Sequence, residues 1–237
     1  MRSSSAAVSG FALVTLCHYF GRRGRAMVRS LSRQQDLTVP IHLIVFHHRA
    51  EDAQLLQDGF VDAPSTLTLK FVPLPENRIL QRALHFSEAH RMHSLSHTVF
   101  FDSDLWFPPS FWSGYAEALS CELPGYWSCP VLELPLSKAE LLLEDWNTLT
   151  QHRLEGLSTG PRYARHGGKV GTFQCIPRGL VDYPADPRAS VAGLDIRFAE
   201  VALDHSLDRR DERRIGKIPA YHFDHPHSWE GTGGVQL

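Results

Sequence analysis

The chain is organised around one stretch, His97-Thr98-Val99-Phe100-Phe101-Asp102-Ser103-Asp104-Leu105-Trp106-Phe107-Pro108-Pro109. Thr98 to Phe101 are β-branched or aromatic, so they predict a strand that is buried on both faces. The strand stops at two carboxylates, Asp102 and Asp104, and a double proline follows. Because ligands bind at the carboxyl ends of strands in open α/β sheets, the two carboxylates are predicted to lie at a binding site.

Two carboxylates one residue apart suit a hard divalent cation. At the end of a strand, Asp102 and Asp104 can both turn toward one ion, which keeps positions free for substrate phosphates. The alternative interpretation makes them turn residues, or caps of a helix that begins near Phe111. The buried strand directly before them favours a site.

The sequence before this stretch alternates between strand and helix patterns. Strands are predicted over 11–17, 41–46 and 66–72, and helices over 25–35, 51–60 and 77–95. This spacing is typical of βαβ units, whose strands run parallel. The predicted fold class is therefore α/β, with a mixed, mostly parallel sheet flanked by helices in a single domain.

The second half has a less regular pattern. It predicts helices over 111–119, 137–152 and 193–207, strands over 126–131, 171–177 and 215–227, and a loop over 156–169. The domain is divided into a disordered N-terminus (1–10), a first half ending in D-x-D (11–109), a second half (110–230) and a flexible tail (231–237).

Composition predicts a soluble cytoplasmic protein without nucleic acid as a partner. The 237 residues carry a formal net charge of −2, which gives no support for binding to nucleic acid or to an anionic membrane. The 4 cysteines have no C-x-x-C spacing, which favours reduced thiols. No apolar run approaches the roughly 18 residues of a transmembrane helix, and the run from Phe11 to Cys17 is interpreted as a strand rather than a signal peptide.

Three separated motifs occur in order along the chain. They are Asp102-Ser103-Asp104, Gly193-Leu194-Asp195-Ile196-Arg197-Phe198, and His222-Phe223-Asp224-His225-Pro226-His227. Their order and spacing resemble the GT-A fold glycosyltransferases, in particular family 2 and its relatives. The resemblance covers roughly Phe11 to Trp229 and implies a single GT-A, Rossmann-like domain.

The resemblance implies a role for each motif. Asp104 would bind Mn²⁺ or Mg²⁺, and Asp102 would touch the donor ribose or the same ion. Asp195 matches the general base that takes the proton from the acceptor hydroxyl. His222 and His225 would complete the metal site, and their imidazoles favour manganese.

Two of these roles have alternatives. Asp195 can instead cap the helix that follows it. His222 and His225 are three residues apart, so a regular strand would not aim both at one ion, and a bulge or turn over 224–226 is required. His227 is equally close and is an alternative ligand.

The nucleotide base lacks its expected partners. Family members carry an acidic pair after the second strand, whereas this chain has His47, His48 and Arg49 there. Tyr19 is a candidate to stack on the base, and Glu51 or Asp52 are candidate substitutes for the acidic pair.

Two further residues are assigned to substrate. Arg82 lies where the family often has an arginine that faces the diphosphate. Trp127 is a candidate apolar wall for a sugar of the acceptor, with a core position as the alternative. The helical spacing of His90, His93 and His97 could suit zinc, but a solvated helix face is the favoured interpretation.

The resemblance implies a metal-dependent, inverting glycosyltransferase. Its partners would be a nucleotide-sugar donor and a glycan, a lipid-linked or a small acceptor, the lipid-linked kind met by peripheral membrane contact. One alternative is a sugar nucleotidyltransferase that uses the Gly-Arg-rich loop 21–25. The others are a catalytically silent nucleotide- or glycan-binding module and a metal phosphohydrolase.

Overall fold

The computed structural model describes residues 8–79, 81–161, 172–183, 191–207 and 214–225, and for 191–196 it describes the backbone alone. In the first half the elements are β1 (Phe11–Cys17), α1 (Gly21–Ser32), β2 (Ile41–His47), α2 (Ala50–Gly59), β3 (Leu67–Pro73), η1 (Glu76–Arg78), α3 (Arg82–Met92) and β4 (His97–Phe101). In the second half they are β5 (Leu105–Trp106), α4 (Phe111–Ser120), β6 (Val131–Leu134), α5 (Leu136–Glu144), η2 (Trp146–Thr148), α6 (Gln151–Glu155), β7 (Phe173–Pro177), α7 (Val191–His205) and β8 (Ala220–Phe223).

The main sheet is mostly parallel, as predicted. Its strand order is β3-β2-β1-β4-β7, and the first four of these strands are parallel. Strand β7 pairs antiparallel to β4 at one edge. Since β4 is followed by the D-x-D, both carboxylates leave the sheet at the carboxyl end of an interior strand, where loops from neighbouring strands diverge.

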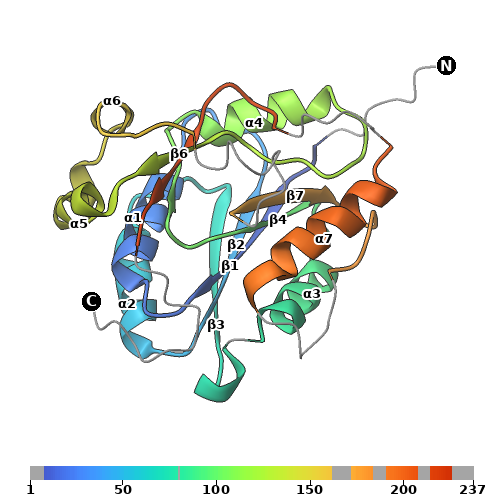
Figure 1. The fold of residues 1–237 in the computed structure, drawn as a ribbon, viewed down its shortest axis with the longest axis horizontal. Coiled ribbons are helices and arrows are strands. Elements are labelled where there is room, and N and C mark those ends of the chain that lie inside the picture. The colour runs from blue at the N-terminus through green and yellow to red at the C-terminus, as the bar shows by residue number, and fades with distance from the viewer. Residues whose placement is uncertain (1–7, 80, 162–171, 184–190, 208–213, 226–237) are drawn as a thin grey trace.

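Helices cover both faces of this sheet. Strand β1 sends Leu13 into a core shared with α1, α2 and α4, and the next residue, Val14, into a second core shared with α3 and α7. This alternation follows from the strand period of two, and it explains why β1 is apolar throughout. Figure 1 has α1 and α2 on one side of the strands and α3 and α7 on the other.

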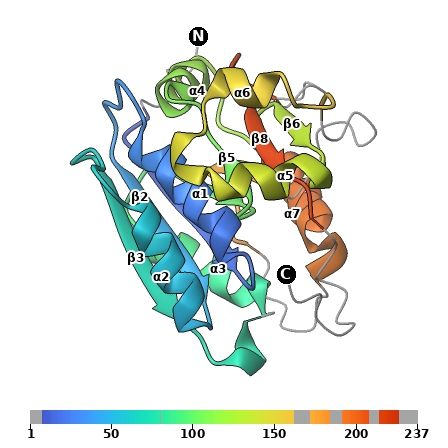
Figure 2. The ribbon, with the colours of Figure 1, turned by 90° about the vertical axis from the view of Figure 1, so that its left-hand side faces the viewer.

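A small second sheet is built from the second half. Its order is β5-β8-β6, with β8 antiparallel to β5 and parallel to β6. Leu134, Leu142, Leu143 and Phe223 form a separate core between this sheet and α5 and α6. Figure 2 shows β6 and β8 together beyond α5, and β5 and α5 contact α1. Strand β8 therefore brings the last described part of the chain next to the residues that follow Asp104.

Two helix boundaries differ from prediction because of capping. Helix α1 begins at Gly21, ahead of the predicted 25, because the Asp52 carboxylate accepts the Gly21 backbone N–H at 3.2 Å. Residues 21–25 are thus helical, which removes the loop that a nucleotidyltransferase would use. The predicted helix 137–152 is split into α5, η2 and α6, because Thr150 caps α6 and accepts from the Arg153 N–H.

Several other predicted bounds were too wide. The helix expected over 77–95 is the short turn η1 followed by α3, and the strand expected over 126–131 begins only at Val131. The strand expected over 215–227 is reduced to Ala220–Phe223. Residues 162–169 of the expected loop, and the tail 231–237, lie outside the described residues.

The histidines assigned to a solvated helix face are buried, so that interpretation was wrong. His90, His93 and His97 are 3%, 8% and 7% exposed. His90 Nδ1 and His93 Nε2 lie 2.6 and 2.7 Å from the Thr98 hydroxyl oxygen. A hydroxyl can donate to one ring and accept from the other, so Thr98 can bond to one nitrogen of each imidazole at the start of β4.

The buried histidines predict acid sensitivity of the fold. Burial lowers the pKa of His93 and of His97 to about 4, below the ordinary value of 6.5. Between these values the unfolded chain binds more protons than the folded chain. We therefore expect the free energy of unfolding to be at its full value above about pH 6.5. As the pH falls from there toward 4, each histidine should lower this free energy by about 1 kcal/mol per pH unit.

Thermal unfolding between pH 7.5 and 4.5 measures this effect. His97→Gln should make the melting temperature less dependent on pH, because it removes one of the groups. His152→Gln is the control, since His152 is exposed. A melting temperature that stays constant over this range would contradict the prediction.

Candidate functional site

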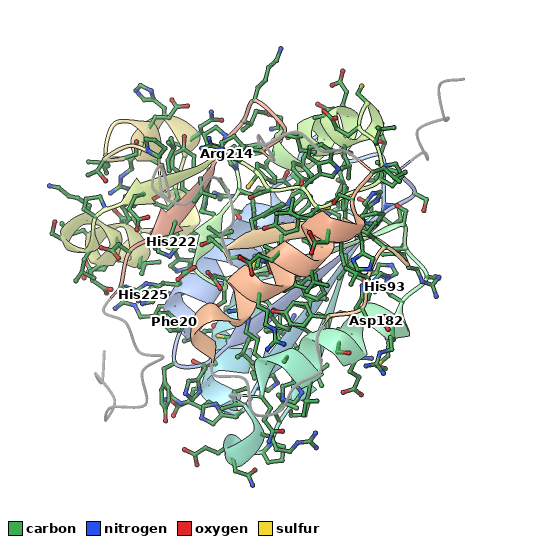
Figure 3. The ribbon with its side chains drawn as sticks, turned by 45° about the vertical axis from the view of Figure 1, so that its right-hand side comes forward. Phe20, His93, Asp182, Arg214, His222 and His225 are labelled. Carbon is green, nitrogen blue, oxygen red and sulfur yellow. The ribbon has the colours of Figure 1, made fainter. Side chains whose placement is uncertain are left out.

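Three side chains from distant parts of the sequence converge beyond the carboxyl end of β4. The Asp104 Oδ2 atom lies 3.2 Å from His222 Nε2 and 2.9 Å from His225 Nε2. One ligand atom from each residue lies within 4.8 Å of the others, and all three side chains are buried. Figure 3 shows His222 and His225 close together beside Phe20.

The small sheet explains how His222 reaches this place. His222 on β8 is paired with Leu105 of β5 on one side and with Glu133 of β6 on the other. Asp104 directly precedes β5, and its carbonyl accepts the Phe223 backbone N–H at 3.0 Å. The register of β8 therefore holds the His222 ring against Asp104.

The two residues directly after β8 bring His225 to the same point. Strand β8 ends at Phe223, and the His225 N–H donates to the Asp224 side chain at 2.9 Å. Arg23, from α1, donates to the Asp224 carbonyl at 3.3 Å. Because the strand has ended, the two histidines need not obey its alternation and both face Asp104. His227, the alternative ligand, lies outside the described residues.

The donor set fits a divalent transition metal. Asp104 is 4% exposed, and its Oδ1 atom is buried with no hydrogen-bond partner among the residues that the structure describes. A buried carboxylate oxygen without a partner is costly, and a cation would satisfy it. One carboxylate and two imidazole nitrogens are ligands that suit Mn²⁺, with room for further oxygen ligands.

Asp102 takes a different direction from Asp104. Ser103 and Asp104 form a turn instead of continuing the strand. Asp102 Oδ1 lies 3.3 Å from Arg82 Nη2, and Asp102 is not part of the three-residue group. Of the two predicted roles of Asp102, contact with the donor ribose or with the same ion, this placement favours the first, and that role stays a prediction.

Arg82 is largely buried. Its side chain is 5% exposed, and its guanidinium stacks on Phe86, 4.7 Å from the ring centroid. The guanidinium is thus engaged by Asp102 and Phe86, and its predicted contact with a diphosphate stays a prediction. Asp102 itself keeps 27% of its side chain exposed.

Aromatic and basic side chains gather where β1 and β2 end. His18 Nδ1 and His48 Nδ1 are 3.2 Å apart, and the Tyr19 ring contacts both imidazoles edge-on. Arg49 stacks on Tyr19 at 4.7 Å, and Tyr19 remains 49% exposed. Burial and the neighbouring His48 lower the pKa of His18 to about 4, so His18 is neutral at pH 7.

Asp52 and Glu51, the candidate substitutes for the acidic pair after the second strand, are both engaged by other groups of the protein. Asp52 is 3% exposed and accepts the backbone N–H groups of Tyr19 and Gly21, both at 3.2 Å. Burial raises the pKa of Asp52, against the opposing effects of Arg49 and these two hydrogen bonds. Glu51 pairs with Arg49 at the surface. The Asp52 carboxylate thus holds the turn between β1 and α1.

The turn between β1 and α1, residues 18–20, connects the aromatic and basic side chains at the end of β2 with the three-residue group. Phe20 contacts the His225 ring edge-on at 4.5 Å, while His18 lies against His48. Residues 18–20 therefore extend from the end of β2 to the three-residue group. Tyr19 has a φ of 63°, which is uncommon for a residue with a side chain and which the two hydrogen bonds to Asp52 support.

The remaining predicted residues have separate outcomes. Asp195 is the fifth residue of α7, so it does not cap that helix, and its side chain lies outside the described part of the chain. Trp127 is 1% exposed and donates through Nε1 to the Leu123 carbonyl. A side chain with so little exposed surface has no face to offer to a sugar, so Trp127 belongs to the core.

Sequence reasoning missed Glu133. Its Oε1 atom lies 2.7 Å from His222 Nδ1, on the side of the ring opposite to Asp104. The signal that points to it is one carboxylate inside the apolar run Val131-Leu132-Glu133-Leu134. A charged residue in a half-buried strand requires a polar partner, and here the partner is the imidazole.

The fold is similar to that of solved GT-A structures. One is the mannosyltransferase PcManGT from Pyrobaculum calidifontis in complex with GDP-Man and Mn²⁺, with a TM-score of 0.58 and 13% identity over 95% of this chain and 60% of that chain. Another is S. aureus TarS 1-349 in complex with UDP, with a TM-score of 0.59 and 12% identity over 90% of this chain and 60% of that chain. TarS 1-349 in complex with UDP-GlcNAc matches with a TM-score of 0.53 and 13% identity over 95% of this chain and 62% of that chain.

These likenesses establish the fold. The predicted α/β class and the GT-A architecture are confirmed. The chain spans about 60% of the length of the matched structures. No protein-family model matches the sequence, and no curated protein sequence matches it either. None of the helices in the described ranges has the length and apolar character needed to cross a membrane.

Proposed function

We propose that this chain, with its GT-A fold, binds a nucleoside diphosphate sugar together with a divalent cation and transfers the sugar to a hydroxyl group. The observation that carries the proposal is the convergence of Asp104, His222 and His225 beyond the carboxyl end of β4. Structures of similar fold are complexes with UDP, with UDP-GlcNAc, and with GDP-Man and Mn²⁺, which supports the same class of donor.

The three converging side chains would hold Mn²⁺ or Mg²⁺, and the two imidazoles favour Mn²⁺. When bound, the cation supplies positive charge for the diphosphate that departs from the sugar. Asp102, supported by Arg82, is assigned to the donor ribose. Its carboxylate is partly exposed and leaves the same strand as Asp104.

Asp195 is assigned the role of general base. It accepts the proton of the acceptor hydroxyl while that oxygen forms a bond to the anomeric carbon. The bond between the anomeric carbon and the diphosphate oxygen breaks, and the electron pair leaves with the diphosphate. A single displacement of this kind inverts the configuration at the anomeric carbon. The acceptor class remains a glycan, a lipid-linked sugar or a small hydroxyl compound.

The base of the nucleotide is assigned to the ends of β1 and β2. Tyr19 offers an exposed ring there, and stacking on a nucleobase needs no particular hydrogen-bond pattern. The neutral His18 and its neighbour His48 supply ring nitrogens for polar contacts.

A nucleotide-binding module without transferase activity is the second candidate. The observation in its favour is that Asp52 and Glu51, the acidic residues that follow β2, are engaged by the turn and by Arg49. Such a module would bind the nucleotide and the metal but would release no diphosphate from the sugar.

Calorimetric titration of UDP and GDP, with Mn²⁺ and with a chelator, tests the proposal. We expect one nucleotide to bind at least about tenfold more tightly with Mn²⁺, a difference of about 1.4 kcal/mol. The preferred sugar nucleotide is then incubated with Mn²⁺, and release of the free nucleoside diphosphate is measured with and without candidate acceptors.

Each result decides between the candidates. Mn²⁺-dependent binding with acceptor-stimulated release of the diphosphate supports the transferase. Mn²⁺-dependent binding without release favours the binding module. If neither nucleotide binds under any condition, the proposed function is wrong.

A further inference from the structure

The His222 ring lies between two carboxylates. Its Nε2 atom lies 3.2 Å from Asp104 Oδ2, and its Nδ1 atom lies 2.7 Å from Glu133 Oε1. The His222 side chain is 1% exposed, whereas the Glu133 side chain is 23% exposed. Both ring nitrogens are therefore engaged, one by Asp104, which directly precedes β5, and the other by Glu133 within β6.

The contact with Glu133 determines which nitrogen carries hydrogen. An ionised carboxylate only accepts hydrogen bonds, so the hydrogen in the 2.7 Å contact belongs to His222 Nδ1. The other ring nitrogen, Nε2, faces Asp104 and His225, and it is available to a metal ion once it carries no hydrogen. Histidines that bind metals commonly donate their second N–H to a carboxylate in this way, which orients the ring and raises its basicity.

The strand that carries Glu133 is fixed on both sides. On one side β6 is paired with β8, where Glu133 is in register with His222. On the other side the Glu133 N–H donates to the Gly160 carbonyl at 3.0 Å, and the Glu133 carbonyl accepts the Thr159 N–H at 2.9 Å. A carboxylate on such a strand is held in place before any ligand arrives.

We propose that Glu133 is a positioning residue for metal binding, acting through His222. The inference rests on the proposed function. Glu133 is not a member of the three-residue group, because its oxygen meets the ring nitrogen that faces away from Asp104. Its effect is to set the tautomer and the orientation of His222, so that Nε2 is ready to bind Mn²⁺.

The test is the affinity of the full chain for Mn²⁺ without nucleotide, measured by calorimetry and by the electron paramagnetic resonance of free Mn²⁺. Glu133→Ala should weaken Mn²⁺ binding by about 10- to 100-fold. The Mn²⁺ affinity of Glu133→Gln should fall less than that of Glu133→Ala, because the amide oxygen can still accept the Nδ1–H hydrogen bond. Glu144→Gln is the matched control, since Glu144 is exposed on α5.

A spectroscopic readout separates positioning from a merely structural role. The ¹⁵N chemical shifts of His222 in the metal-free protein report which nitrogen is protonated. We expect the Nδ1–H form in the wild type and in Glu133→Gln, and a shift toward the Nε2–H form in Glu133→Ala. A structural role alone would lower the melting temperature and leave the tautomer unchanged.

The outcomes distinguish this inference from the function on which it rests. If the wild type binds no Mn²⁺, the proposed metal site fails and this inference fails with it. If the wild type binds Mn²⁺ and Glu133→Ala binds it equally well, only this inference is overturned. Should Glu133→Ala fail to fold, Glu133→Leu, which has a side chain of similar size but no hydrogen-bond acceptor, takes its place, and a Mn²⁺ affinity of Glu133→Leu equal to that of the wild type overturns the inference.

Discussion

Replacing Asp104 with asparagine is expected to abolish metal-dependent nucleotide binding. The variant removes the only carboxylate of the three-residue group and leaves two imidazoles, which bind Mn²⁺ weakly by themselves. We expect the Mn²⁺ affinity to fall by more than about 100-fold, since even residues behind the ligands contribute about 10- to 100-fold. Sugar transfer should fall by a factor of about 100 to 1,000 or more, because charge stabilisation of the departing diphosphate is lost. Calorimetry with Mn²⁺ and UDP or GDP measures the first effect.

The control for this variant is Asp58→Asn. Asp58 is exposed on α2, so the same change of charge and shape is made away from the site. Circular dichroism and thermal unfolding establish that both variants are folded. Retention of Mn²⁺-dependent nucleotide binding by Asp104→Asn would show that the metal is held elsewhere.

Asp195→Asn is expected to lower the turnover number while leaving the affinity for the nucleotide unchanged. If Asp195 accepts the proton of the acceptor hydroxyl, its amide counterpart cannot, and general base catalysis of about 100- to 10,000-fold is lost. The dissociation constant of the nucleotide with Mn²⁺ should remain as in the wild type, because the three-residue group is unchanged. The turnover number in the presence of acceptor is the quantity to compare.

Asp204→Asn serves as the matched variant, because Asp204 is exposed on the same helix, α7. It should keep both turnover and nucleotide binding. Equal turnover in Asp195→Asn and the wild type would exclude Asp195 as the base. Loss of nucleotide binding in Asp195→Asn would instead place Asp195 at the donor.

The alternating first half could be predicted from sequence because its signals are local. Strands β1, β2 and β4 are short apolar runs rich in β-branched residues, and their parallel pairing follows from the helices between them. The sequence pattern predicted the first residues of α1 and α6 less accurately. The N–H of Gly21 is satisfied by Asp52, which is distant in sequence, and propensity reasoning does not include such a partner.

The candidate site was predicted less completely, since its geometry depends on contacts between distant segments. The residue types of the three-residue group follow from the motifs, but the end of β8 at Phe223, which lets both histidines face Asp104, is not encoded in their spacing. The burial of Arg82 beneath Asp102 depends on how α3 packs on the sheet. Glu133 was missed because its partner, His222, is 89 positions away.

The position of β8 has a consequence for the biosynthesis of the protein. The strands β1 to β4 and β7 all precede β8 in the chain, so the main sheet can form on the ribosome before β8 is synthesised. His222 and His225 reach Asp104 only when β8 is inserted between β5 and β6. Under the proposed function, metal binding therefore follows the synthesis of β8, because a nascent chain that has only its main sheet lacks two of the three proposed ligands.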